Sequence, residues 1–318
     1  PPRSTLFPYT TLFRSGTNIE IGYGINLTVP AGKASVVCHD LYLNPTAKLT
    51  VDGTLHVQGD FQTTMDDNGS ATVIDNGTLQ IDGTKSLQLV IPTSDGYYYI
   101  SIPFAGIAAS VFGNIATTEF LYMRNTLTSS WDRITNGGQE LIVGTGYAVK
   151  LTGSPRYINF SGSALTSGNF NPVLTYGGDN WNLIGNPYPS AIDWGTENDP
   201  TGWSFNNVRN TIYVKHGGTF AIWNGAVDGE ALNGGTRVIS PMQSFWVKAL
   251  GESPSAGMNN LIRVHNNGGL LKSNVDFCQK LRVKVAREAY TDEALLKFHS
   301  NSENSVDKLD AEKLFATD

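Results

Sequence analysis

The sequence has little cysteine, little charge and no long apolar run. Only Cys38 and Cys278 occur, far apart, so two free thiols are favoured over a disulfide bridge. No stretch approaches the roughly 18 to 20 apolar residues of a membrane-spanning helix. The 22 Lys and Arg residues are scattered and are outnumbered by 28 Asp and Glu residues, which argues against a nucleic-acid partner.

Patterns for metal or cofactor chemistry are also missing. The chain contains no GxSxG, phosphate-binding loop, dinucleotide fingerprint or HExxH. Cys38 and His39 are adjacent, and adjacent residues of a strand point to opposite faces, so they would not share one zinc ion. We predict no metal site and no cofactor, because no metal-ligand spacing occurs among the five histidines: His39, His56, His216, His265 and His299.

Acidic residues in Gly- and Asn-rich segments have two interpretations. Asp66–Gly69 and Asp75–Gly77 could offer oxygen ligands to calcium, but they lack the alternation and closing Glu of a calcium loop, so Asx turns are favoured. A polysaccharide lyase or glycosidase needs two carboxylates, or a base and a cation, across one cleft. We predict no enzyme activity, because solvated loop charges explain the candidates equally well: Asp193, Asp199, Asp228 and Glu230.

Glycine and aromatic residues are abundant instead. With 34 Gly, 13 Tyr and 14 Phe but only 16% charged residues, the composition favours strands and turns over helices, and we predict an all-β protein. In residues 16–92, short apolar strands alternate with Gly or Asn turns. Leu49–Gly59 is echoed by Ala71–Gly83, which predicts a short parallel β-solenoid, with a meander in a sandwich as the alternative.

Residues 93–270 contain an internal duplication, with halves at about 96–165 and 178–266. Three matched segments show offsets of 84, 91 and 98 residues, a steady rise that loop insertions would produce. We therefore predict a duplicated β-sandwich region. The matched pairs are Tyr98–Pro103 with Asn182–Pro187, Leu121–Arg124 with Ile212–Lys215, and Gly146–Lys150 with Ser244–Lys248.

The two ends of the chain differ from the regions between them. Residues 1–15 repeat the letters TLF and resemble translated sequencing-adaptor read-through, so we predict a non-native segment. Near the other end, Leu281–Val285 alternates strictly, and Glu293–Phe298 is its expected pairing strand. Two strands cannot close a core alone, so residues 274–318 are predicted to be the truncated start of a further β-domain.

A motif in the second half carries a family resemblance. WNLIGNPYPSAIDW (181–194) is followed by IYVKHGGTFAIWNG from Ile212 and by ISPMQSFWVKA from Ile239. This trio, in this order, resembles large surface and secreted proteins exported by the type IX secretion system. The resemblance implies export to a secreted or cell-surface location, although the C-terminal sorting domain of such proteins is absent here. Two tail segments look like the start of the β-domain that commonly follows: TDEALLKF (291–298) and VDKLDAEKLF (306–315).

Two prolines shape the centre of this motif. Pro187 and Pro189 fix φ and force the residues before them to be extended, so the chain must leave its strand as a rigid loop. Gly185 is expected to adopt a backbone geometry closed to other residues. The surrounding aromatics could form a platform for sugar rings, although a rigid corner with buried aromatics is favoured. The candidate ligand-binding residues are Trp181, Tyr188, Trp194 and Trp223.

These patterns predict a non-catalytic structural or adhesive region of a secreted or cell-surface protein. Its partners would be extracellular glycans or other surface proteins, and the export machinery is implied by the resemblance alone. One alternative is a carbohydrate-binding module attached to a missing catalytic domain. The other is a fragment of a polysaccharide-active enzyme.

Overall fold

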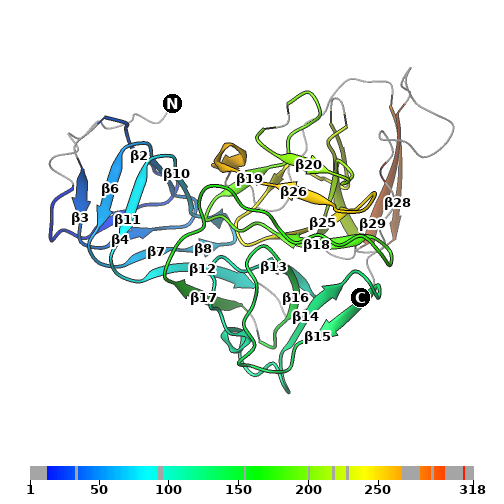
Figure 1. Cartoon of the computed structure of the whole chain (residues 1–318), viewed down its shortest axis with the longest axis horizontal. Coiled ribbons are helices and arrows are strands. Elements are labelled where there is room, and N and C mark those ends of the chain that lie inside the picture. The colour runs from blue at the N-terminus through cyan, green and yellow to red at the C-terminus, as the bar shows by residue number, and fades with distance from the viewer. Residues whose placement is uncertain are drawn as a thin grey trace.

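The computed structural model is all-β, as the sequence predicts (Figure 1). Its described residues contain two short 3₁₀ helices, Ala109–Phe112 (η1) and Asn260–Ile262 (η2). Neither helix has the length or the apolar character needed to cross a bilayer. The structure describes residues 13–32, 35–91, 96–153, 155–199, 201–216, 219–226, 229–266, 280–287, 290–297 and 311.

The N-terminal region is a parallel β-solenoid, which confirms the prediction. Thr54 pairs with Thr78 and Leu55 with Leu79 in parallel register, so the echoed segments stack as successive coils and do not form an antiparallel meander. Three sheets run along the stack. They are β1 (Ile19–Ile21), β4 (Leu41–Leu43), β7 (Phe61–Thr63) and β12 (Lys85–Ile91); β2 (Asn26–Val29), β5 (Lys48–Val51) and β10 (Thr72–Asp75); and β3 (Val36–Cys38), β6 (Thr54–Val57) and β11 (Thr78–Ile81).

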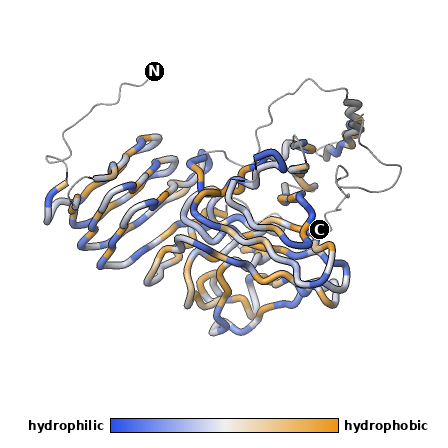
Figure 2. Tube along the Cα trace, turned by 45° about the horizontal axis from the view of Figure 1, so that its top comes forward, coloured by the Kyte–Doolittle hydropathy of each residue, from blue (hydrophilic) through white to orange (hydrophobic). Residues whose placement is uncertain are grey.

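Alternating side chains and close-packed corners hold the coils together. Leu49 and Leu55 are fully buried between the sheets, and the hydropathy colouring of Figure 2 shows apolar and polar residues alternating along the coils. At one corner, a Cβ on Gly77 would lie 2.1 Å from the carbonyl oxygen of Gly53, so only glycine fits there. At another, the N–H of Asp60 donates to Asp40 Oδ1 at 2.8 Å, which links one coil to the next.

Phe13 packs against the solenoid core. Its side chain is 7% exposed, and the N–H of Thr17 donates to the carbonyl of Arg14 at 3.0 Å. Phe13 therefore belongs to the folded body in this structure, although it lies in the segment predicted to be non-native. Residues 1–12 lie outside the described residues.

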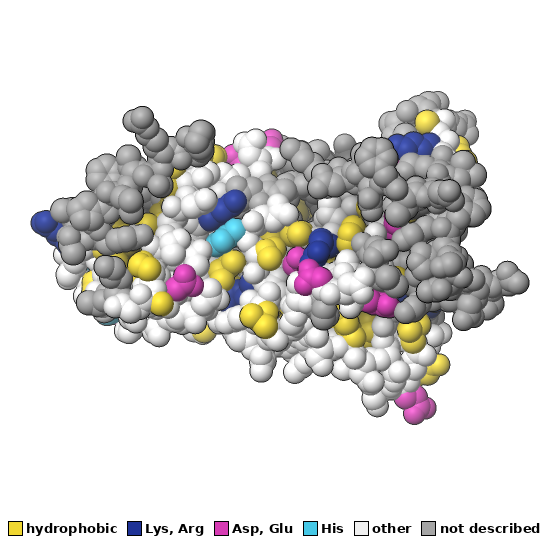
Figure 3. All heavy atoms as spheres, turned by 90° about the horizontal axis from the view of Figure 1, so that it is seen from above, with side chains coloured by type: hydrophobic (Ala, Val, Ile, Leu, Met, Phe, Trp, Pro, Cys, Tyr) yellow, Lys and Arg dark blue, Asp and Glu magenta, His cyan; other side chains and the backbone are white. Residues whose placement is uncertain are grey.

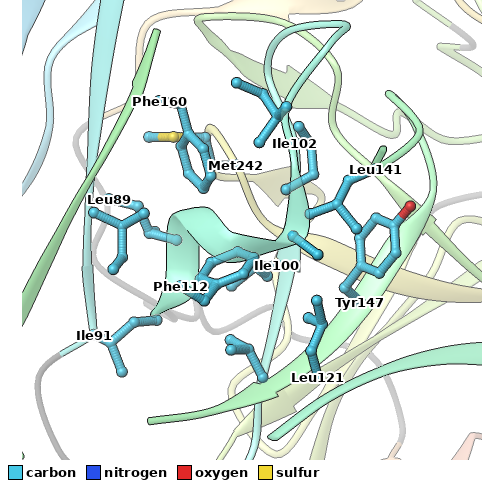
Figure 4. Packing of buried hydrophobic residues seen from close by; sticks show 14 of the residues in the cluster. Leu89, Ile91, Ile100, Ile102, Phe112, Leu121, Leu141, Tyr147, Phe160 and Met242 are labelled. Carbon is cyan, nitrogen blue, oxygen red and sulfur yellow. The ribbon is translucent and has the colours of Figure 1, made fainter. Parts of the chain in front are cut away.

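The first half of the duplicated region shares a strand with the solenoid. Strand β12 pairs in parallel with β7 on one side and antiparallel with β17 (Arg156–Gly162) on the other. A four-stranded antiparallel sheet packs over these strands, and Figure 4 shows the core between them, where Leu89 and Phe160 meet Ile100 and Leu121. The sheet order is β13 (Tyr98–Ser101), β16 (Gly146–Lys150), β14 (Phe120–Asn125) and β15 (Ser130–Arg133).

The second half encloses a separate core. Ile184 and Phe245 of its large sheet pack against Ile192 and Trp194, which lie at the C-terminal end of the 181–194 motif. The large sheet has the order β18 (Trp181–Gly185), β25 (Ser244–Lys248), β21 (Thr211–His216), β22 (Thr219–Asn224) and β23 (Glu230–Leu232). Two smaller sheets cover it: β24 (Val238–Ile239), β19 (Ala191–Asp193) and β27 (Arg263–Val264), and β20 (Ser204–Asn206) with β26 (Ser255–Gly257).

The two large sheets have the same strand order and register over their first three strands. When the offsets of 84, 91 and 98 residues are added to the numbers of two residues that pair in the first sheet, they give two residues that pair in the second. The equivalent pairs are Ser101–Gly146 with Gly185–Ser244, and Tyr122–Ala148 with Tyr213–Trp246.

The halves meet through equivalent residues. The N–H of Ser101 donates to the carbonyl of Met242 at 2.8 Å, and the N–H of Gly185 donates to that of Gly144 at 2.9 Å. The same offsets relate Ser101 to Gly185 and Gly144 to Met242, so the contact has local twofold symmetry. Gly144 and Met242 also share left-handed backbone, with φ of 76° and 56°.

The C-terminal strands pair as predicted. β28 (Lys280–Arg287) and β29 (Tyr290–Lys297) form an antiparallel hairpin in which Val283 lies opposite Ala294. Residues 306–315 lie outside the described residues, apart from Ala311.

Candidate functional site

The proline motif forms a rigid corner after β18. Asn186 is buried, and its Nδ2 donates to the carbonyls of Ser190 (2.8 Å) and Ser240 (3.0 Å). Its Oδ1 accepts the N–H of Tyr188 at 3.0 Å. One side-chain amide therefore satisfies the backbone groups that the prolines leave without sheet partners. The predicted exit of the chain from its strand is confirmed, because β18 ends at Gly185.

The expected reason for glycine at position 185 is wrong. Gly185 has ordinary extended backbone and is not among the residues with positive φ. A Cβ at this position would instead lie 2.2 Å from Ser101 Oγ, across the contact between the two halves. Glycine is required because two backbones approach closely.

The corner docks against the solenoid through Arg263. The N–H of Val73 in β10 donates to the carbonyl of Pro189 at 2.9 Å. The Arg263 side chain is fully buried, lies 2.6 Å from Asp75 Oδ1 through Nη1, and donates from Nη2 to the carbonyl of Val73 at 2.8 Å. Its guanidinium also lies over the ring of Tyr188 at 5.3 Å. One side chain thus contacts both the solenoid and the motif.

His265 completes this junction. Its Nε2 is 2.9 Å from Thr50 Oγ1 in β5, and its Nδ1 is 2.8 Å from Thr72 Oγ1 in β10. Burial, together with the positive charges of Lys48 and Arg263, lowers the pKa of His265 to about 4. The imidazole is therefore neutral at physiological pH and bridges two strands of the solenoid.

Three of the four predicted ligand-binding residues lie in the core. Trp181, Tyr188 and Trp194 are 6%, 0% and 1% exposed, which leaves no ring face for a sugar. Trp194 Nε1 donates to Asn210 Oδ1 at 2.6 Å, and the Tyr188 hydroxyl donates to the carbonyl of Gly168 at 2.7 Å. The structure therefore favours the alternative of a rigid corner with buried aromatics.

Trp223 is less buried than the other three residues, but it also packs against a core. It is half-buried, packs against the second core, and donates from Nε1 to the carbonyl of Gly195 at 3.0 Å. Tyr188, Trp194 and Trp223 belong to the second core, and Trp181 belongs to the cluster around Trp246.

Two of the acidic candidates are paired with one arginine. Asp193 and Asp199 both bind Arg237, at 2.5 Å to Nε and 2.9 Å to Nη2. Glu230 lies in β23, next to Gly229, where a Cβ would lie 3.1 Å from Thr196 Cγ2 in the loop that contains both aspartates. Asp228, Cys278 and His299 lie outside the described residues.

The turn segments considered for calcium bind protein groups. Asp66 Oδ1 accepts the N–H of Asn68 at 2.8 Å, in the hairpin of β8 (Met65–Asp66) and β9 (Gly69–Ser70). Asp75 pairs with Arg263. Within the described part of the chain, no three His, Cys, Asp or Glu side chains are grouped to hold a metal ion.

The first large sheet has an unusual surface on the side away from its core. Ile100, Leu121 and Val149 point into the core, so their neighbours along each strand lie on the opposite face. That face should be polar if solvent covered it, but it is mainly aromatic and cationic. We define the aromatic–cation face as Tyr97, Tyr99, Phe120, Tyr122, Arg124, Trp131, Arg133 and Lys150.

Part of this face is closed by the second half. Tyr99 and Trp131 lie 5.9 and 5.7 Å from the ring of Trp246, and the guanidinium of Arg124 lies 5.6 Å from the same ring. Burial raises the pKa of Tyr99 to about 12. Ala311 also packs against this cluster.

The rest of the face is open to solvent. Tyr97, Phe120, Tyr122 and Lys150 are half-buried, and Arg133 is exposed. The guanidinium of Arg133 lies 4.8 Å from the ring of Phe120, and Lys150 Nζ lies 6.0 Å from that of Tyr97. We call these five residues the open part of the face.

Two cation positions repeat in both halves. Lys150 over Tyr97 corresponds, by the duplication offsets, to Lys248 over Trp181 at 5.2 Å. Lys215 corresponds to Arg124 and lies 5.7 Å from the Tyr99 ring of the other half. Part of the signal was present in the sequence, because Tyr98–Tyr99 and Phe245–Trp246 are adjacent aromatic pairs, and adjacent residues of a strand point to opposite faces.

Comparisons with family models, with curated proteins and with solved structures found no match for this chain.

Proposed function

We propose that this chain is a non-catalytic structural or adhesive region of a secreted or cell-surface protein. The type IX secretion system is its proposed export route, and this rests on the resemblance of the 181–194 motif and the segments that follow it. Extracellular glycans or other surface proteins are the proposed partners.

The supporting observation is the continuity of the β-framework. β12 belongs both to the solenoid and to the first half of the duplicated region. Arg263 joins the second half to β10 through a buried ion pair. A framework joined in this way holds the exposed surfaces of the duplicated region at fixed positions relative to the solenoid. Adhesion under mechanical load requires such rigidity.

Adhesion can be measured with beads that carry the purified chain and flow over surfaces coated with extracellular glycans or surface proteins. Albumin-coated beads are the control, and reducing sugar ends are measured in the outflow. We expect retention above the control on at least one surface, with no release of reducing ends. Retention equal to the control on every surface would contradict an adhesive role, and saturable release of reducing ends would favour the enzyme.

A carbohydrate-binding module is the second candidate, and the aromatic–cation face favours it. Half-buried aromatic rings with adjacent cations suit the stacking and hydrogen bonding of sugar rings. This candidate predicts that the isolated chain binds a soluble polysaccharide with a defined stoichiometry. A purely structural region would bind none.

A further inference from the structure

The open part of the aromatic–cation face concentrates positive charge on an acidic protein. The chain has a formal net charge of −6. Among the described residues, Arg133 and Lys150 have no ion-pair partner, and the strand positions of this face include no Asp or Glu. Asp132, the nearest acidic residue along β15, faces Met123 on the other side of the sheet. The two cations therefore create a local positive potential.

The aromatic rings position Arg133 and Lys150 and leave the N–H groups of both side chains available as hydrogen-bond donors. A guanidinium stacked over Phe120 keeps N–H groups in its plane for a planar acceptor, and a carboxylate matches that geometry. Lys150 stands between Tyr97 and Phe120, because β16 lies between β13 and β14 in the sheet. Tyr97 and Tyr122 meet edge to face at 5.7 Å, which adds apolar surface beside the charges.

Figure 3 shows an arrangement in which charges are paired. Near the centre of that view, a cationic side chain lies beside acidic ones, and hydrophobic side chains are scattered. Arg237, for example, is paired with both Asp193 and Asp199. Cations that have no ion-pair partner among the described residues, beside aromatic rings, therefore make the open part suited to an external anion.

We infer that the open part of the aromatic–cation face binds acidic polysaccharides, whose sugar rings carry carboxylate or sulfate groups. The rings of Tyr97, Phe120 and Tyr122 contact the apolar faces of the sugars. Arg133 and Lys150 bind the acidic groups. This inference rests on the proposed function and names the class of glycan that its surface recognises.

Binding of the full chain to polygalacturonate by isothermal titration calorimetry tests the inference, with neutral dextran as the control polymer and dextran sulfate as a second anion. We expect binding to polygalacturonate but not to dextran, weakening as salt increases. Arg133→Gln and Lys150→Gln should each weaken binding about threefold to tenfold. If the chain also binds dextran sulfate, the site recognises anionic sugars in general. If it binds polygalacturonate but not dextran sulfate, the site recognises uronates.

Matched variants separate this site from general charge effects. Lys48→Gln removes a cation from the solenoid and should leave the affinity unchanged, as should Tyr23→Ala, which removes an exposed ring there. Phe120→Leu should weaken binding about threefold while keeping its salt dependence. Unchanged melting temperatures show that the variants remain folded.

Equal affinity for dextran and polygalacturonate would overturn the inference. So would unchanged affinity in the Arg133→Gln, Lys150→Gln double variant, or an equal loss in Lys48→Gln. If the double variant keeps its affinity for polygalacturonate while the unaltered chain is still retained on protein surfaces, the adhesive function stands and only the glycan assignment fails. If beads carrying the unaltered chain are retained no better than the albumin control on every surface, the proposed function itself is rejected.

Discussion

At the scale of single residues, Arg263 carries the junction between the solenoid and the duplicated region. A buried guanidinium is stable only when its donors and charge are satisfied, and here Asp75 and the carbonyl of Val73 satisfy them from the solenoid side. Ser190 and Asn260 contribute acceptors from the other side, at 3.3 and 3.1 Å. The ion pair therefore links regions that are distant in sequence.

Replacement of Arg263 by Met should destabilise the protein by about 3 to 5 kcal/mol, because it leaves the buried Oδ1 atom of Asp75 without its partner. Urea unfolding followed by tryptophan fluorescence measures the change. Arg133→Met, at an exposed position, is the control and should stay within about 0.5 kcal/mol of the unaltered protein. If Arg263→Met lowers the free energy of unfolding no more than Arg133→Met does, the ion pair does not hold the junction.

His265 should make stability depend on pH. Its pKa is about 4 in the folded protein, against an ordinary value of 6.5, so the unfolded chain binds the proton first as pH falls. The neutral histidine's contribution is complete above about pH 6.5 and is lost as pH decreases toward about 4. The melting temperature should fall more steeply over this range in the unaltered protein than in His265→Gln. Parallel curves would contradict this assignment.

At the scale of elements, the contact between the two halves depends on small residues. A Cβ on Gly185 would meet Ser101, and one on Gly146 would lie 2.4 Å from Leu183 Cγ. Overpacking of this kind forces backbones apart.

Gly185→Ala should therefore cost about 1 to 3 kcal/mol in the free energy of unfolding. Gly22→Ala is a matched control, because its Cβ would meet only Ile25 Cγ1 at 3.7 Å. Equal stability of the two variants, measured by urea unfolding, would refute close approach as the reason for glycine.

Much of the element structure could be predicted from the sequence because it depends on local patterns. Turn residues and alternation identified the solenoid coils, and the matched segments predicted two related halves, whose sheets share one register in the structure. The side-chain roles were harder to predict. Trp194 and Tyr188 were candidates for a ligand platform, but a large ring in a loop motif looks the same in sequence whether it is exposed or buried.

At the scale of the whole molecule, the junction could not be predicted at all. Arg263 reaches Val73 across 190 positions, and no periodicity connects residues so far apart. The open part of the aromatic–cation face was missed for a related reason. The ligand-binding candidates were taken only from the 181–194 motif and Trp223, whereas Phe120 and Tyr122 lie in another strand, on the face opposite Leu121.

Solenoid and duplicated region should unfold together if the buried junction couples them. All six tryptophans, from Trp131 to Trp246, report on the duplicated region. Cys38 reports on the solenoid, because it is fully buried and burial raises the pKa of its thiol to about 11, so it reacts slowly until the coils open. A Cys278→Ser background makes the thiol signal specific.

The decisive measurement is urea unfolding of this variant followed by both probes. We predict coincident midpoints for tryptophan fluorescence and Cys38 thiol reactivity, and separate midpoints once Arg263 is replaced by Met. Reactivity of Cys38 at urea concentrations where the fluorescence is still native, with Arg263 in place, would contradict a single continuous framework.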